Sequence, residues 1–385
     1  MVWVPVMTVS LTAATVVALQ PGSLADLWLV RGWLRHWLAG GNPYSHFHGG
    51  IDYPPAAFLV LWPLGLPSDT TITVAFMPLA IMTMTMAGLV LVRWLSERLA
   101  IALPWQAQVA LVAMMLSGGA TRGGVWRGQT AALAILLGAL ALFWCHRRPL
   151  AAALALALCS YKPHLALGFG LVILLSEWRP WVVVIAVALV LGLSAGFAAS
   201  IDQSLPQVLR LYAENLLALY GGPDRVRGLL SIRWVIEDLL ADYARGTTVY
   251  VVMALASLVL IALAAYRRRD AAGRAMVAAA CLLWSLLFLP QQLYHGLLAW
   301  PAVWLVMWPE GGIIRTQAGR LLVVAALVLF TVADVPRLAL LLVDPADPLA
   351  QAPYYWRPLR LVTLLALMMY GLSAVRSPIA RIDEP

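Results

Sequence analysis

Long apolar runs separated by short polar turns limit what this chain can fold into more than any other feature. About 20 apolar residues cross a bilayer, and Leu/Ala/Val runs without two-residue alternation exclude a β-barrel. We therefore expect an all-α polytopic membrane protein of about 11–13 transmembrane helices. The expected spans are residues 2–20, 71–92, 104–120, 129–144, 149–160, 164–176, 181–198, 248–266, 275–290, 296–308, 321–337 and 358–375.

The charge content supports a membrane location and excludes other classes. Only 11% of the 385 residues are charged, against about 25% in soluble domains. The net charge of +8 comes from arginines scattered between apolar runs, with no basic stripe for nucleic acid. Such arginines suit anionic or phosphorylated lipids. The three cysteines, far apart in the sequence, give neither a metal spacing nor a disulfide framework.

The arginine clusters predict the orientation. If an uncleaved first span starts in the cytoplasm and the spans alternate, most clusters fall inside, as the positive-inside rule requires. The whole chain, 1–385, is then one integral domain in the cell membrane. Its two large outer loops would be 21–70 and 199–247.

Each large outer loop has a predicted structure of its own. The proline-rich apolar segment 53–66 is expected to be re-entrant, because a full crossing would place the later arginine clusters outside. Leucines and tyrosines at helical spacing in 199–247 predict two amphipathic helices on the outer interface. Residues 149–160 and 164–176 are either one span broken at Pro163 or two short spans meeting at a polar tip.

Carboxylates of the first outer loop are candidate catalytic groups. Asp26 opens a predicted helix that runs to about Leu38, and a carboxylate there could take a proton from an attacking hydroxyl. The alternative is a capping box, since Ser23 precedes Asp26 by three residues. Asp52 is the second candidate, with a turn role after two glycines as its alternative.

Cationic and polar residues at other predicted outer turns are candidates to bind a phosphate. Lys162 is the sole lysine and lies between two apolar half-spans, where an ionisable group suggests function, unless it snorkels to the interface. Arg122 and Arg127 lie in a short outer loop, where loop solvation is the alternative. The remaining candidates for phosphate or sugar contact are Arg31, Tyr53, Gln129 and His295, the last with a structural role as its alternative.

Metal and nucleotide sites have little support in the sequence. His46 and His48 with Asp52 offer suitable ligand types, but no spacing rule supports a metal there. No Gly-rich phosphate loop follows a strand, and an Asp-x-Asp pair for a metal-bound nucleotide sugar is missing. We therefore expect no metal and no cofactor.

The order of several short motifs resembles glycosyltransferase family 87, a family of the GT-C superfamily. The motifs are Asp26-Leu-x-x-x-Arg31, Gly41-Asn42-Pro43-Tyr44, Tyr53-Pro54-Pro55, Gly128-Gln129, Tyr161-Lys162-Pro163, and Pro290 followed by His295. The resemblance implies a membrane enzyme that transfers a sugar, mannose by family default, from a polyprenyl-phosphate donor. It also implies that Asp26 is the base and that the Tyr-Pro-Pro, Gly-Gln and Lys-Pro motifs line an outer cavity.

Together these features predict transfer of a sugar to a glycolipid or cell-envelope glycan at the extracytoplasmic face. One base fits inversion, whereas retention usually needs a second carboxylate as nucleophile, a role left open for Asp52. Arginine and lysine would neutralise the departing phosphate without a metal. The competing hypothesis is a flippase for a lipid-linked sugar, which predicts ionisable groups near the bilayer midplane. The acceptor, the linkage and the oligomeric state are open.

Overall fold

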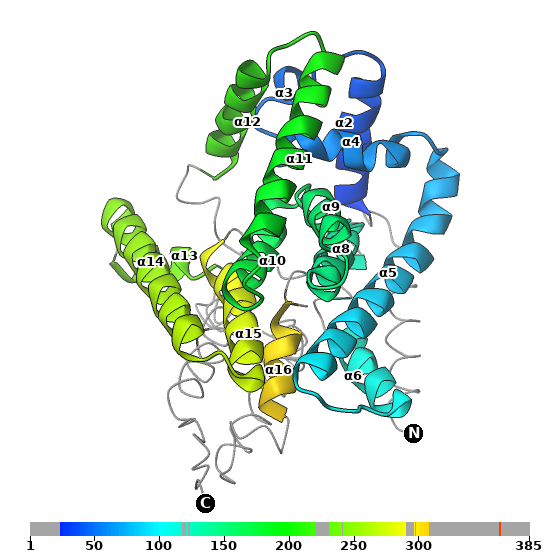
Figure 1. Cartoon of the computed structure of the whole chain (residues 1–385). Coiled ribbons are helices and arrows are strands. Elements are labelled where there is room, and N and C mark those ends of the chain that lie inside the picture. Colours follow the sequence, from blue (N-terminus) through cyan, green and yellow to red (C-terminus); the bar gives the residue numbers. More distant parts are fainter. Residues whose placement is uncertain are drawn as a thin grey trace, which may run out of the picture.

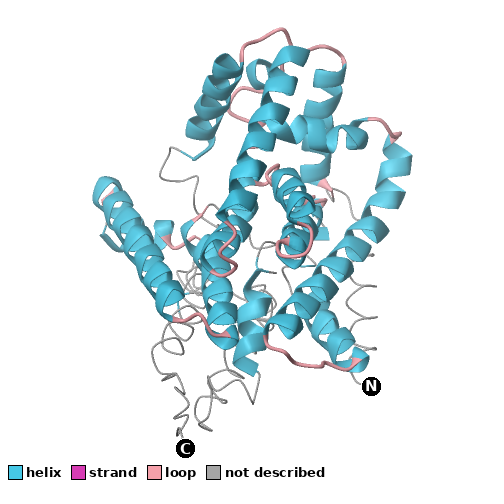
Figure 2. Cartoon of the chain, viewed as in Figure 1, coloured by secondary structure: helices cyan, strands magenta, loops and turns pink. Residues whose placement is uncertain are grey.

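A computed structural model describes residues 24–117, 121, 124–125, 127–220, 231–240, 242–289, 296, 298–307 and 362. Within them the chain forms helices joined by loops, and no strand is drawn (Figure 2). The predicted spans 2–20, 321–337 and all but one residue of 358–375 lie outside the described part. The all-α class is confirmed.

The helices follow the apolar runs of the sequence closely. Four of them, α5, α11, α14 and α15, are long and apolar enough to cross a membrane, and α8, α9 and α10 are shorter apolar helices. The bounds are α2 Ala25–Leu38, α3 Pro43–His46, α4 Pro55–Leu61, η1 Trp62–Gly65, α5 Asp69–Arg98, α6 Trp105–Ser117, α8 Ala131–Trp144, α9 Pro149–Cys159, α10 Pro163–Leu175, α11 Pro180–Ser200, α12 Leu205–Tyr220, α13 Arg233–Leu240, α14 Tyr243–Arg267, α15 Ala271–Phe288 and α16 Trp300–Met307.

A buried carboxylate holds three turns together at one end of the bundle. Glu177, after α10, accepts hydrogen bonds from Arg98 at the end of α5 and from His146 after α8. Arg179 in turn donates to His146 Nδ1 at 3.1 Å, so His146 is neutral and its Nε2–H donates to Glu177. Burial, reinforced by Arg98, holds the pKa of His146 below its usual value. We call this the arginine end, for Arg93, Arg98, Arg147, Arg148 and Arg179.

The hydrogen bond between His146 and Glu177 also determines how α9 and α10 lie relative to each other. Because His146 precedes α9 and Glu177 follows α10, the two helices are antiparallel and form a hairpin. Pro163 begins α10, at the first helical position that proline favours. The structure therefore selects two short helices over one broken span, and Lys162 lies at the tip of their hairpin.

The opposite end of the bundle carries α2, α3, α4 and α12, and we call it the loop end (Figure 1). The segment Pro55–Gly65 is helical and apolar there. It is less than about 20 Å long, too short for a hydrocarbon core of about 30 Å. This length fits the predicted re-entrant segment. The predicted amphipathic helices of 199–247 are confirmed as α12 and α13.

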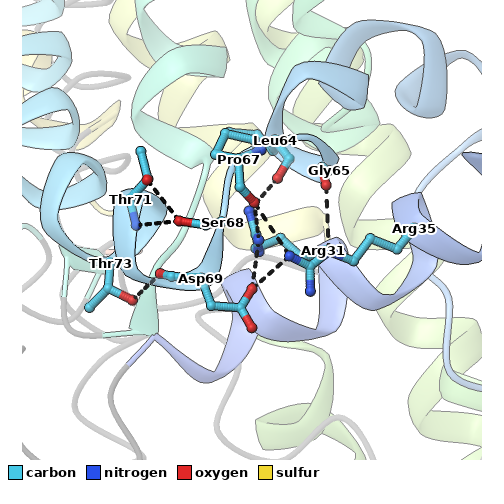
Figure 3. Close-up of polar contacts among 9 residues, drawn as sticks. All are labelled: Arg31, Arg35, Leu64, Gly65, Pro67, Ser68, Asp69, Thr71 and Thr73. Carbon is cyan, nitrogen blue, oxygen red and sulfur yellow. Dashed lines mark hydrogen bonds and ion pairs between the residues drawn. The ribbon is translucent and has the colours of Figure 1, made fainter.

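Arg31 fixes α2 to the connection between η1 and α5 (Figure 3). Its side chain is 1% exposed. The guanidinium donates to the carbonyl oxygens of Leu64 at 2.6 Å and Pro67 at 2.8 Å, and to Asp69 Oδ1 at 2.8 Å. Arg35, one helical turn later, also reaches Asp69 but is 46% exposed. The buried arginine thus satisfies backbone carbonyls of the turn at the end of the short apolar segment Pro55–Gly65.

Replacing Arg31 by alanine is expected to destabilise the loop end far more than replacing Arg35. Arg31→Ala leaves two partly buried carbonyls without their donor, at up to about 1–3 kcal/mol for each unsatisfied group. Arg35→Ala removes a partly exposed ion pair, at about 0–1 kcal/mol. Thermal unfolding of the purified variants in detergent measures both. Equal shifts of Tm would contradict the structural role of Arg31.

Candidate functional site

The turn before α8 lies unusually close to the start of α2. Gly128 has a φ of +73°. A Cβ at this position would lie 2.7 Å from Leu27 Cβ and 2.9 Å from Leu24 Cα. Glycine is therefore required twice, for its backbone conformation and for the close approach of α2. This approach brings the next residue, Gln129, within reach of Asp26.

A cavity of about 180 Å³ opens at this contact. Its wall combines polar groups from α2, the loop before α4, the turn before α8, the tip of the α9–α10 hairpin and the end of α12. The lining residues are Asp26, Leu29, Val30, Trp33, Gly50, Asp52, Tyr53, Arg127, Gln129, Lys162, Leu219 and Tyr220. Segments far apart in the sequence thus form one site at the loop end.

Gln129 joins the carboxylate of Asp26 to the ammonium of Lys162. Its Nε2 donates to Asp26 Oδ2, and its Oε1 accepts from Lys162 Nζ at 3.3 Å. The partners fix the orientation of the amide, because a carboxylate only accepts and an ammonium only donates. A base and a cation are thereby held on either side of one neutral side chain.

Aromatic side chains hold Lys162 in place. Lys162 is 5% exposed, and its Nζ lies 4.3 Å from the ring centroid of Tyr53, a cation–π contact. The Tyr53 hydroxyl pairs with Thr130 Oγ1 at 3.2 Å, and the Tyr161 hydroxyl donates to the Thr130 carbonyl. The ammonium is therefore a buried charge with a defined position.

Arg127 lies on the open side of the cavity. Its side chain is 53% exposed, and its Nη1 lies 3.9 Å from Asp26 Oδ1, beyond hydrogen-bond distance. Asp26 lies in the first turn of α2, where the helix dipole favours negative charge. Asp26 Oδ1 thus faces a cation without being hydrogen-bonded to it, and could accept a proton.

Asp52 forms a second acidic position, on the α12 side of the cavity. The Tyr220 hydroxyl donates to Asp52 Oδ2 at 3.1 Å, and Tyr212 donates to the Asp52 carbonyl at 3.4 Å. Burial, with the charge of Asp52 as a further cause, raises the pKa of Tyr220 well above its usual value. Tyr220 therefore stays protonated as a donor to Asp52.

A buried asparagine holds α12 against the first loop. Asn215 is fully buried. Its Oδ1 accepts from the Gly49 amide at 2.8 Å, and its Nδ2 donates to the Tyr44 carbonyl at 3.3 Å. The sequence predicted this helix from its leucines and tyrosines, whereas its fully buried residues are Val208 and the polar Asn215. Asn215 and Tyr220 were not identified from the sequence, because neither belongs to a motif.

Six of the nine residues predicted for the site lie together in the cavity: Asp26, Asp52, Tyr53, Arg127, Gln129 and Lys162. Arg31 does not. Its guanidinium is bound to the connection between η1 and α5, which gives it a structural role; its contact with phosphate stays a prediction. Arg122 and His295 lie outside the described residues, and their roles stay predictions.

The structure also bears on three alternatives left open by the sequence. The residue preceding α2 is Leu24 and makes no side-chain capping bond, so the helix starts one residue later than the capping box requires. Lys162 does not snorkel outward, because it is buried. Within the described part, the one group of three close metal-type ligands is Cys145, His146 and Glu177 at the arginine end. The His46, His48 and Asp52 side chains do not form such a group.

Gly128→Ala is expected to disrupt this site without unfolding the protein. The new Cβ would force α2 away and place alanine at a positive φ, which costs about 1–2 kcal/mol for L-residues. Gly192→Ala in α11 is the matched control, because a Cβ there meets nothing within 4 Å. Sugar transfer and thermal unfolding in detergent should show a large loss of activity for Gly128→Ala alone. Equal activity of the two variants would show that the close approach is dispensable.

Comparison with known proteins bears on the kind of chemistry. The family model of glycosyltransferase family 87 matches residues 52–290, more than half of the chain. The match begins at Asp52, so it contains most of the cavity residues but not Asp26. No curated protein matches the chain. Because the family model covers so much of the sequence, the chain belongs to glycosyltransferase family 87.

Proposed function

We propose that this membrane glycosyltransferase transfers a sugar, mannose by family default, from a polyprenyl-phosphate donor, with inversion and without a metal ion. The observation that carries the proposal is the Asp26–Gln129–Lys162 chain in one cavity. It sets a carboxylate base beside a buried cation. A displacement at the anomeric carbon needs both, because a proton leaves the acceptor while negative charge develops on the departing phosphate.

In the proposed step the carboxylate acts on the acceptor and the cations act on the leaving phosphate. Asp26 takes the proton of an acceptor hydroxyl on a glycolipid or cell-envelope glycan. The hydroxyl oxygen bonds to the anomeric carbon as the bond from that carbon to the phosphate oxygen breaks. Lys162 and Arg127 stabilise the polyprenyl phosphate that leaves. Two cations suffice for a monophosphate, so EDTA is expected to leave the rate unchanged.

Charge distribution supports an extracytoplasmic active site in the cell membrane. Arginines gather at the end of the bundle opposite the cavity. By the positive-inside rule this distribution favours the cytoplasm for that end and the outer face for the cavity. Family membership and the one-sided cavity favour an enzyme over the flippase alternative. Turnover in detergent distinguishes the two, because a flippase converts nothing without two compartments.

Asp26→Asn is expected to reduce kcat by about 10²–10⁴-fold, because the amide cannot take a proton. The matched control is Asp202→Asn, an exposed position after α11 with a positive φ that asparagine tolerates. Transfer of labelled sugar from polyprenyl-phosphate mannose to a membrane extract measures both. Full activity of folded Asp26→Asn would contradict the assignment of Asp26 as the base and make Asp52 the next candidate.

Lys162→Gln is expected to lower kcat/KM for the donor by about 10–100-fold, because a buried charge-assisted contact to phosphate is lost. Arg127→Gln is expected to have a smaller effect, because Arg127 is half exposed and solvent screens its charge. Initial rates at varied donor concentration, at two salt concentrations, separate the variants. A smaller effect for Lys162→Gln than for Arg127→Gln would contradict the assigned roles.

A further inference from the structure

A second pocket lies at the arginine end, far from the cavity of the candidate site. It has a volume of about 280 Å³ and is enclosed by the last turns of α5, the connection to α6, α6 itself and α16. Its lining residues are Val92, Leu95, Ser96, Leu99, Ile101, Leu103, Ala107, Ala110, Leu111 and Trp304. This lining is almost wholly apolar and would accept a hydrocarbon chain. The Ser96 hydroxyl donates a hydrogen bond to the Val92 carbonyl at 2.7 Å.

One polar group of this lining has no partner. Trp304 is 3% exposed, and its indole Nε1 finds no acceptor among the described residues. Buried N–H groups are nearly always paired, and an exception calls for an explanation. A ligand that brings both a hydrocarbon chain and a hydrogen-bond acceptor would satisfy this pocket.

Positive charge flanks the pocket on α5 and on the neighbouring turn. Arg93 and Arg98 lie in the same last turns of α5 as the pocket residue Leu95, and the pocket residue Leu99 follows Arg98 directly. Arg147 bonds to Glu97 at 3.2 Å, which brings the turn between α8 and α9 to this place. Three of the five arginines that define this end are paired with Glu97 or Glu177, and Arg148 and Arg179 form no ion pair with a carboxylate among the described residues. The surplus positive charge matches an anionic head group.

The spacing along α5 fits the depth of a phospholipid. Val92 and Arg98 are six residues apart, about 9 Å along the helix axis. The arginines would then meet the phosphate level, while the deeper wall meets the acyl chain. Trp304 lies on the wall of the pocket, where the ester carbonyls of a glycerolipid would offer the missing acceptor.

We propose that this pocket binds an anionic diacyl phospholipid. One acyl chain fills the pocket, an ester carbonyl accepts from Trp304 Nε1, and the phosphate lies against the exposed arginines. Because the site is distant from the cavity, it is independent of the sugar-transfer proposal. Its tests need no turnover.

The direct experiment titrates delipidated protein in detergent with defined lipids and follows Tm and retention of labelled lipid. Ester-linked phosphatidylglycerol is expected to bind with saturation and to raise Tm. Ether-linked phosphatidylglycerol, which lacks the carbonyls, is expected to bind about 5–10-fold more weakly. Phosphatidylcholine, which has no net charge, is expected to bind more weakly than phosphatidylglycerol. Arg148→Gln should reduce this difference in binding between the two lipids.

Three variants separate the parts of the site. Trp304→Phe keeps the ring but removes the N–H, so it should abolish the difference between ester and ether lipids. Ala110→Phe should fill the pocket and abolish saturable binding. Val252→Phe is its matched control, because residue 252 is 60% exposed on α14 and away from the pocket; it should bind lipid like the wild type.

Several outcomes would overturn the proposal. These are equal binding of phosphatidylcholine and phosphatidylglycerol, an ester–ether difference that survives in Trp304→Phe, or unchanged binding by Ala110→Phe. Displacement of the labelled phospholipid by polyprenyl phosphate, which has no ester carbonyl, would assign the pocket to a different lipid.

Discussion

The close approach of α2 to Gly128 is the constraint on which the cavity depends. Only at this separation does Asp26 reach Gln129, and only through Gln129 is the carboxylate related to Lys162. Arg31 secures the same helix further along by satisfying the carbonyls of Leu64 and Pro67. The helix is thus held at its start by the glycine contact and near its middle by a buried guanidinium.

Each end of the bundle buries one charged side chain, and the two have different neighbours. At the arginine end Glu177 is almost fully buried; Arg98 compensates its charge and neutral His146 donates a hydrogen bond to it, as a charge in a low-dielectric interior requires. At the loop end the buried Lys162 has a neutral amide and an aromatic face as neighbours. Because these two described neighbours are neutral, the cation is available to bind an anion, which is the property the proposed donor site requires.

The two ends also differ in the kind of site that they form. The loop end collects polar groups from five segments around one cavity. The arginine end provides charged turns and an apolar pocket beside them. The proposed lipid site and the proposed donor site therefore lie at opposite ends, so a phospholipid bound at one would not compete with the donor at the other.

Much of the fold was predictable because helix length and apolar runs follow from the bilayer alone. Within the described part, each predicted span corresponds to a helix, and the motifs around Asp26, Tyr53, Gln129 and Lys162 proved to meet. The structural contacts of Arg31 could not be predicted from the sequence. Its partners are backbone carbonyls in a turn 33 residues away and beyond, and carbonyls carry no signature in a sequence.

The sequence by itself determined the membrane class, the helical elements and the residue types available for the chemistry, because hydrophobic length and local turn signals are properties of short segments. Only the tertiary structure decided that Asn215 locks α12 to the first loop, that Tyr220 faces Asp52, and that Gly128 admits α2. These depend on the distance between segments far apart in the chain, which packing sets and no single segment encodes.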